Sequence, residues 1–161
     1  MNDDKLSDKL DEKLKAVYDA IPHRPPFLFV DEIVETGENK IVTRTKMDAS
    51  REFFKGHYPG RPIVPGVILC ETAFQSGAIL ISRMMEDKAA VSGGVPVVTR
   101  VSEVKFRKMV APDDVIETTV EIVEKVGPAY FMKAHISSGG KNAMRCEFAV
   151  SLVENGGGNG Q

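Results

Sequence analysis

The sequence predicts an α+β domain in which an antiparallel β-sheet wraps around one long central hydrophobic helix, with an additional amphipathic helix at the N-terminus. Three observations predict this architecture. An apolar segment long enough for a buried helix runs from about Pro65 or Gly66 to Met85. Strand-like segments separated by turn residues lie on both sides of it. The first twenty residues combine charged side chains with apolar ones at helical spacing.

The central helix is expected to be buried, because its apolar residues cover most of its circumference. Pro65 suits a first helical position, where its missing N–H would have no partner. Glu71, Gln75 and Arg83 interrupt the apolar run before the roughly 20 residues that a membrane span needs, so a core helix is expected. The apolar positions are Val67, Ile68, Leu69, Ala73, Phe74, Ala78, Ile79, Leu80, Ile81, Met84 and Met85.

The strands are predicted from runs of β-branched and aromatic residues bounded by turns. Alternation is clearest from Val115 to Ile122. The turns fall at residues 37–39, 112–114, 127–128 and 138–140, where glycine, proline, asparagine and aspartate gather. The predicted strands are Phe27 to Glu35, Lys40 to Met47, Pro96 to Arg107, Val115 to Val126, Ala129 to Ser137 and Asn142 to Val153.

Composition divides the chain into three parts. Residues 1–20 are predicted to form an amphipathic helix that packs as a lid on its own domain, a partner-binding role being the alternative. Residues 21–154 are predicted to form one globular domain, since a chain of 161 residues can bury a sizeable core. The Gly/Asn-rich tail, residues 155–161, has nothing to bury and is expected to be disordered. The apolar face of the first helix consists of Leu6, Leu10, Leu14, Val17 and Tyr18.

Charge and cysteine content argue against several classes of function. A net charge of −2 gives no reason to expect binding to nucleic acid or to a membrane. Cys70 and Cys146 form neither a disulfide framework nor a metal-ligand spacing, so free buried thiols are expected, and no other metal motif is present. The charged N-terminus does not resemble a signal segment. A cytoplasmic protein without a metal is therefore expected.

A loop dense in proline and glycine, Gly56 to Gly66 (GHYPGRPIVPG), leads directly into the central helix. Such a mixture specifies a rigid loop of defined shape, and it holds His57 before the helix. Glu71 follows about 7 to 8 Å along the helix axis from Gly66. A histidine can accept a proton near neutral pH, and a carboxylic acid in a core resists ionisation and can donate one. The N–H groups at the helix start suit a developing oxyanion.

Each of these residues also has a plainer interpretation. His57 taken alone could be structural or solvent-exposed. Glu71 taken alone could be a core group bonded to backbone or to an arginine. A second histidine, His23, lies in a PHRPP loop and is interpreted as a structural imidazole that bonds backbone. The pairing of His57 with Glu71 across a helix start favours a catalytic function and leaves the substrate open.

Three motifs resemble those of the FabZ-type 3-hydroxyacyl-[acyl-carrier-protein] dehydratases. The loop GHYPGRPIVPG and the helix element ETAFQ resemble the family's GHFPGxPxMPG and EAMAQ-like elements, with the same spacing from His57 to Glu71. Upstream, PHRPPFLFVD resembles the family's PHRxPFLLVD, and downstream VKFRKMVAPDD is a looser match. The resemblance spans about Ile21 to Val153.

The resemblance implies a hot-dog fold and dehydration of a (3R)-3-hydroxyacyl thioester to a trans-2-enoyl thioester in fatty acid biosynthesis, without a cofactor. His57 would take a proton from C2, Glu71 would protonate the leaving hydroxyl, and the Gly66 N–H would polarise the thioester carbonyl. It also implies a homodimer whose sites combine His and Glu from two chains, and members of the family commonly assemble such dimers into a hexamer, a trimer of dimers. Further site residues are expected in two groups, a substrate tunnel at Tyr58, Pro65, Val67 and Phe74, and docking of acyl carrier protein at Arg61, Arg100, Lys105, Arg107 and Lys108.

The chain departs from the family pattern at a few positions. Thr72 and Phe74 replace smaller or more flexible residues, which leaves the acyl chain length open. Asp113 stands where the family has glycine, and aspartate tolerates left-handed backbone. Glu71 favours this family over the related dehydratase-isomerases, which typically have aspartate there. The alternatives are another hot-dog enzyme, either an acyl thioesterase or a CoA-dependent enoyl hydratase, and a non-catalytic acyl-binding protein.

Overall fold

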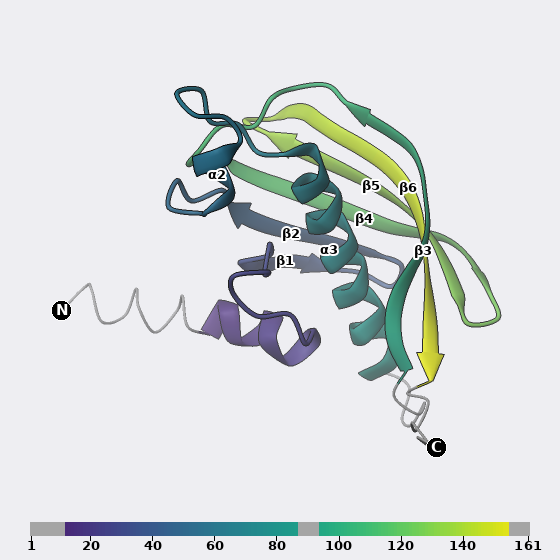
Figure 1. The fold of residues 1–161 in the computed structure, drawn as a ribbon. Helices are drawn as coiled ribbons and strands as arrows, with labels where there is room; N and C mark the ends of the chain where they lie inside the picture. The colour runs from purple at the N-terminus through teal and green to yellow at the C-terminus, as the bar shows by residue number, and fades with distance from the viewer. Residues whose placement is uncertain (1–11, 87–93, 155–161) are drawn as a thin grey trace, which may run out of the picture.

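A computed structural model describes residues 12–86 and 94–154 (Figure 1). Residues 12–20 are helical and precede an irregular, proline-rich segment that turns at residues 25–27. The remaining elements follow in the order β1 (Glu32–Thr36), β2 (Lys40–Lys46), α2 (Phe53–Gly56), α3 (Gly66–Glu86), β3 (Gly94–Phe106), β4 (Val115–Val126), β5 (Ala129–Ser138) and β6 (Lys141–Glu154).

The strands form one antiparallel sheet of six strands in the order β1-β2-β4-β5-β6-β3. Hairpins connect β1 to β2, β4 to β5 and β5 to β6, at three of the turns predicted from the sequence. β3 comes directly after α3 in the described chain yet pairs with the last strand, so it closes one edge of the sheet while β1 forms the other. Each of these two edge strands has one side without a neighbouring strand among the described residues.

The sheet curves around α3, which lies across its concave face (Figure 1). This arrangement is the hot-dog fold, and it confirms the predicted fold class. The middle of α3 is fully buried, with Ile79, Leu80 and Ile81 almost inaccessible to solvent. At Gly77 an added Cβ would come within 2.9 Å of Met132 Sδ and Phe148 Cζ, so glycine permits the close approach of helix and sheet. By length and composition α3 would also suit a membrane span, but its burial against the sheet identifies it as the core helix.

Two local features differ from the sequence prediction. The first strand begins at Glu32 instead of Phe27, because the backbone of residues 27–29 bonds to side chains of other elements and not to a neighbouring strand. The short helix α2 was not predicted, since four residues give no detectable periodicity. The expected left-handed backbone at Asp113 is confirmed by its φ of 64°.

The N-terminal helix packs on its own domain over the part that the structure describes. Val17 is fully buried, and Leu14 and Tyr18 contact the core cluster. This packing supports the predicted lid. Leu6 and Leu10 lie outside the described residues, as does the predicted disordered tail, residues 155–161.

Candidate active site

The loop before α3 is held in shape by its own backbone. Tyr58 and Arg61 exchange hydrogen bonds, Tyr58 N to Arg61 O at 3.4 Å and Arg61 N to Tyr58 O at 3.0 Å, and Gly60 between them takes a φ of 78° that favours glycine. Val64 N donates to Val110 O at 2.8 Å, which fastens the loop to the segment after β3. The expectation of a rigid, shaped loop is met.

His57 is fixed by this loop in a single tautomer. Its Nδ1 lies 3.0 Å from the carbonyl oxygen of Ile63. A carbonyl oxygen can only accept, so Nδ1 carries the hydrogen and donates it. In the neutral imidazole the lone pair then resides on Nε2, which is the state that a general base requires. The imidazole also stacks on the Tyr58 ring, with centroids 4.2 Å apart.

His57 and the start of α3 border the same cavity, which has a volume of about 380 Å³. Ile68 N and Leu69 N donate to Pro65 O, whereas the N–H groups of Gly66 and Val67 have no acceptor in the part of the chain that the structure describes. An added Cβ on Gly66 would lie 2.7 Å from Phe106 Cζ, so only glycine allows Phe106 to cover this helix start. The cavity is lined by His57, Ile63, Val64, Gly66, Leu69, Phe106, Arg107, Lys108, Met109 and Val110.

Glu71 lies on another side of α3 and is not among the residues that line this cavity. Its side chain is 22% exposed, so it borders the core instead of entering it as the sequence suggested. Gln75 Nε2 donates to Glu71 Oε1 at 3.0 Å, and His23 Nε2 lies 3.8 Å from the same oxygen. Within one chain the structure therefore brings His57 and Gly66 together and separates Glu71 from them.

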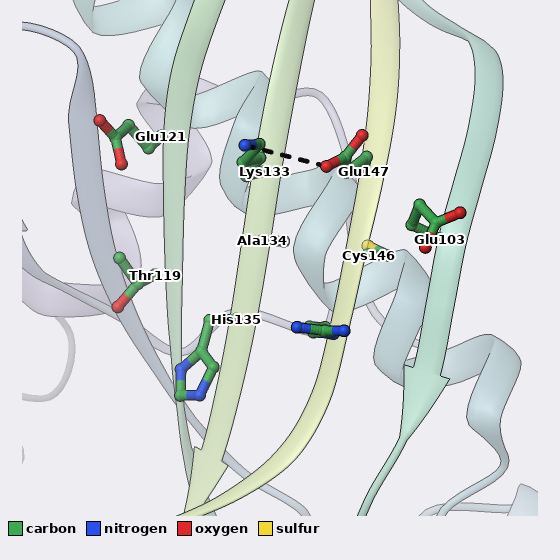
Figure 2. A pocket seen from close by; sticks show the side chains of 9 residues that line it. Glu103, Thr119, Glu121, Lys133, Ala134, His135, Cys146 and Glu147 are labelled. Atoms are coloured by element: carbon green, nitrogen blue, oxygen red, sulfur yellow. Dashed lines mark ion pairs between the residues drawn. The ribbon is translucent and has the colours of Figure 1, made fainter.

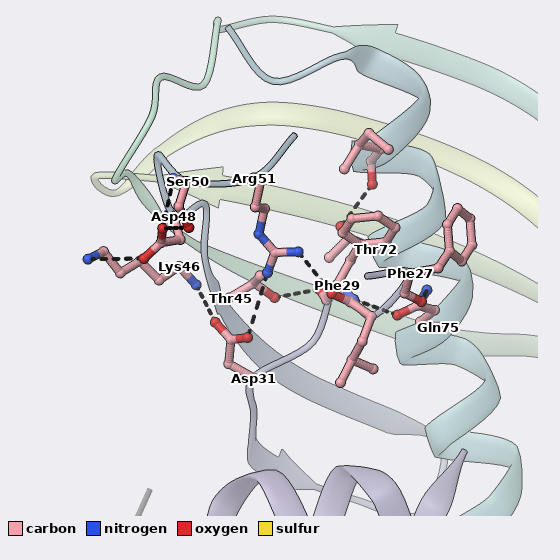
Figure 3. A network of polar contacts seen from close by, with 12 residues as sticks. Phe27, Phe29, Asp31, Thr45, Lys46, Asp48, Ser50, Arg51, Thr72 and Gln75 are labelled. Atoms are coloured by element: carbon pink, nitrogen blue, oxygen red, sulfur yellow. Dashed lines mark hydrogen bonds and ion pairs between the residues drawn. The ribbon is translucent and has the colours of Figure 1, made fainter. Parts of the chain in front are cut away.

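The proline-rich segment, residues 22–31, packs across α3 beside Glu71. It is fastened by side chains from three elements: Gln75 Oε1 accepts from Phe29 N at 2.8 Å, Thr45 Oγ1 donates to Phe29 O at 2.7 Å, and an Arg51 nitrogen donates to Leu28 O at 2.9 Å (Figure 3). At its end, Lys46 N donates to Asp31 Oδ2 at 2.7 Å. Burial raises the pKa of the Asp31 carboxyl, while the Lys46 backbone bond and the nearby Arg51 charge oppose that rise.

The four expected tunnel residues do not form one wall in the single chain. Tyr58 and Val67 are 55% and 74% exposed, and Pro65 caps the start of α3. Phe74 instead packs inward against Phe148, with ring centroids 5.0 Å apart. Their role in a tunnel stays a prediction.

A second, mostly apolar groove was not predicted from the sequence. It has a volume of about 430 Å³ and lies between the C-terminal half of α3, the start of β3 and the N-terminal connection. Ala78, Ser82 and Met85 follow Glu71 on one face of α3, so the helix links the groove to the carboxylate. The groove is lined by Ala20, Ile21, Pro22, Ala78, Ile81, Ser82, Met85, Gly94, Val95, Pro96 and Leu152.

The five candidate docking cations are not equivalent. Lys108 Nζ donates to Ser138 O at 3.0 Å, and Lys105 pairs with Glu103 at 3.2 Å, so both are already engaged. Arg61, Arg100 and Arg107 are exposed, and among the described residues their side chains have no hydrogen bond or ion pair. Arg107 also borders the His57 cavity.

The outer face of the sheet carries a further cavity of about 370 Å³ (Figure 2). Acidic and basic side chains alternate across it, and Lys133 pairs loosely with Glu147 at 3.9 Å. This face lacks a dominant charge. Cys146 lies beneath it, and burial, with smaller contributions from Cys70 and Glu147, raises the pKa of its thiol to about 12. Cys70 and Cys146 are both free, as the sequence predicted.

Known proteins place this architecture in a family. A family model described as a FabA-like domain matches residues 21–147. The 3-hydroxyacyl-[acyl-carrier-protein] dehydratase FabZ of Clostridium novyi is 39% identical over 142 residues, which is 86% of this chain and 96% of that protein. The chain belongs to the FabZ-type dehydratase family. The FabZ proteins of Lactococcus lactis and Caulobacter vibrioides are each 36% identical to this chain. The first match covers 86% of this chain and 89% of the relative, and the second covers 84% and 85%.

Solved structures show the same fold at low sequence identity. The dehydratase heterocomplex ApeI:P of Xenorhabdus doucetiae superposes with a TM-score of 0.75 at 10% identity, covering 86% of this chain and 91% of that one. A hypothetical thioesterase of Streptococcus pneumoniae, solved with coenzyme A, superposes with a TM-score of 0.57 at 21% identity. The match covers 76% of this chain and 88% of that one. The FabZ-type assignment rests on the sequence relatives, and these structures add the hot-dog fold alone.

Proposed function

We propose that this FabZ-type protein dehydrates (3R)-3-hydroxyacyl-[acyl-carrier-protein] to trans-2-enoyl-[acyl-carrier-protein] in fatty acid biosynthesis. The observation that carries the proposal is the geometry of His57, whose Nδ1–H is committed to Ile63 O while the ring borders a cavity at the start of α3. A base and the Gly66 N–H, which has no acceptor among the described residues, therefore lie at one cavity. The named relatives supply the substrate class.

The residues support an elimination in which no cofactor takes part. Nε2 of His57 removes the proton from C2, and the electron pair of that C–H bond forms the C2–C3 double bond. The C3–O bond breaks, and the hydroxyl leaves as water with a proton from Glu71. The N–H of Gly66 donates to the thioester oxygen, which becomes negative as C2 loses its proton. His57 gains one proton and Glu71 loses one, so the reaction is neutral overall.

We propose that the working unit is a homodimer joined through β3. This edge strand spans 13 residues and exposes Val95, Val97, Val98, Val101 and Phe106. Long apolar edge strands pair with other chains unless they are protected. A second copy placed there would bring its own Glu71 toward the His57 cavity, which no carboxylate lines among the described residues of its own chain. Assembly of dimers into a hexamer stays a prediction, and the free thiols support a cytoplasmic location.

The acyl chain of the substrate would occupy the apolar groove beside α3. Ala78 borders the groove about 10 Å along the helix axis from Glu71 and on the same face, given the usual rise per residue. Small side chains at Ala78 and Ser82 leave room for a hydrocarbon tail. The groove thus offers a binding site for the acyl chain. The predicted tunnel residues Tyr58 and Val67 are both exposed and form no such site in the single chain.

The test of the function compares substrates directly. The unaltered protein is incubated with 3-hydroxyacyl and trans-2-enoyl thioesters of several chain lengths, on carrier protein and on CoA, and interconversion and free thiol are both measured. We expect reversible hydration on the carrier-bound substrate and no thiol release. A preference for the CoA substrate would favour an enoyl-CoA hydratase. Release of free thiol would favour a thioesterase, and binding of the thioester without turnover would favour an acyl-binding protein.

Carrier docking is proposed at Arg107, because its guanidinium is exposed beside the His57 cavity. We expect Arg107→Glu to raise the KM for carrier-bound substrate about tenfold at low salt, since rim charges act mainly on association with an acidic partner. The KM for the CoA thioester and both kcat values should change little. Arg145→Glu, on the outer sheet face, is the matched control. Equal effects of the two substitutions would contradict docking at Arg107.

A further inference from the structure

We propose that His23 is a positioning residue for Glu71, acting as an uncharged donor that fixes which carboxyl oxygen carries the catalytic proton. The inference rests on the proposed function. It assigns a chemical role to a histidine that the sequence suggested was purely structural.

The tautomer of His23 follows from its two ring nitrogens. Nδ1 is buried and has no hydrogen-bond partner among the described residues, whereas Nε2 faces Glu71 Oε1 at 3.8 Å. A hydrogen on Nδ1 would be a buried donor without an acceptor, and in a charged imidazole this would cost still more. In the neutral ring with its hydrogen on Nε2, the donor is instead on the nitrogen that lies 3.8 Å from a carboxyl oxygen, which can accept, and Nδ1 keeps only a lone pair.

Gln75 shows which Glu71 oxygen is the acceptor. The orientation of its amide group is fixed by the backbone of the proline-rich segment, because Oε1 accepts from Phe29 N at 2.8 Å and Nε2 donates to Phe27 O at 3.2 Å. The same Nε2 reaches Glu71 Oε1 at 3.0 Å. Gln75 is almost inaccessible to solvent, so this arrangement is rigid. Gln75 thus donates to Oε1 and the His23 ring faces the same oxygen, which leaves Oε2 as the oxygen that carries the proton and releases it.

The backbone around His23 is braced in a way that holds the imidazole in place. The Arg24 guanidinium donates to Ile21 O at 2.9 Å, to His23 O at 2.7 Å and to Tyr18 O at 3.2 Å, and it lies 4.4 Å from the centre of the Tyr18 ring. These contacts join residues 21–24 to the N-terminal helix. A separation of 3.8 Å is slightly beyond a hydrogen bond, and catalytic contacts commonly shorten when substrate binds.

Two titratable groups in the described part of the chain interact with this carboxyl. They are His23 and, on the same helix, Cys70, whose thiol pKa is raised by burial and by the nearby Glu71 carboxyl. Arg24 directs its guanidinium to backbone oxygens of residues 18–23. Among the described residues, His23 is therefore the imidazole placed to act on Glu71 Oε1, alongside the amide of Gln75.

The test compares two replacements of His23 in the full-length protein. His23→Gln keeps an uncharged amide donor near the Nε2 position, and His23→Leu removes the donor while filling similar space. We expect His23→Leu to lower kcat at least about tenfold with KM within about twofold, because loss of orientation at the reacting group acts on the chemical step. His23→Gln should restore most of the rate.

A second background separates positioning from folding. In a Glu71→Gln background, His23→Leu should lower the residual rate no further. Thermal unfolding of both single variants is measured alongside.

Several results would overturn the inference. A kcat for His23→Leu equal to that of the unaltered protein would do so, as would an equal loss of kcat in His23→Gln. A further fall in the Glu71→Gln background would show a structural role independent of the carboxyl. An inactive unaltered protein would overturn the proposed function and this inference together. An active unaltered protein with an unaffected His23→Leu variant would overturn this inference alone.

Discussion

His57→Ala and Glu71→Gln are each expected to lower kcat on carrier-bound 3-hydroxyacyl thioester by about 10² to 10⁴, the usual cost of losing a general base or acid. His57→Ala removes the lone pair on Nε2 that the Nδ1–H···O=C bond to Ile63 leaves free. Glu71→Gln keeps the shape of the side chain and removes the transferable proton. Both variants should bind substrate and remain folded, as followed by KM and thermal unfolding.

Mixing the two inactive variants tests whether the His57 and Glu71 of one active site come from the same chain or from two chains. In the single chain His57 borders a cavity from which Glu71 is absent, so we expect the two to meet across a dimer. Half of randomly mixed dimers contain one chain of each kind, and one of their two sites is then intact, so about a quarter of the unaltered activity should return. The variants are co-unfolded and refolded, and each variant refolded alone is the control.

No recovery from a mixture with proven subunit exchange would show that each site lies within one chain. Full activity of Glu71→Gln would remove Glu71 from the mechanism, and full activity of His57→Ala would do the same for the proposed base.

Charging the β3 edge is expected to abolish assembly and, with it, turnover. Val97→Lys combined with Val101→Lys places two cations on a strand whose valines are exposed in the single chain. Lysines on an edge strand block its pairing with another edge. We expect a monomer by light scattering and a loss of activity of about 10² or more, because the shared site cannot form.

The matched control for the β3 edge is Val123→Lys. Val123 is half exposed like the β3 valines but belongs to β4, an interior strand of the sheet, and lies at the bulge in its pairing with β5. Its replacement should leave both mass and activity unchanged. A β3 variant that remains dimeric, or a monomer with full activity, would contradict the proposed assembly.

The sequence by itself determined the fold class and the local parts of the site. The apolar run from Gly66 onward specifies a core helix wherever it packs, and period-two alternation specifies the strands, because both patterns depend only on neighbouring residues. Proline and glycine likewise predicted the rigid loop that carries His57. The turn at Asp113 was predicted in the same way, and its left-handed backbone is confirmed.

The tertiary structure decided every relation between distant residues. Only the folded chain shows that residues 27–29 bond to Gln75 and Thr45 and so delay the first strand to Glu32. It also separates Glu71 from the His57 cavity and sets His23 beside Glu71, although 48 positions part them in the sequence. Such contacts depend on the packing of elements against one another. Local periodicity and spacing contain no information about that packing.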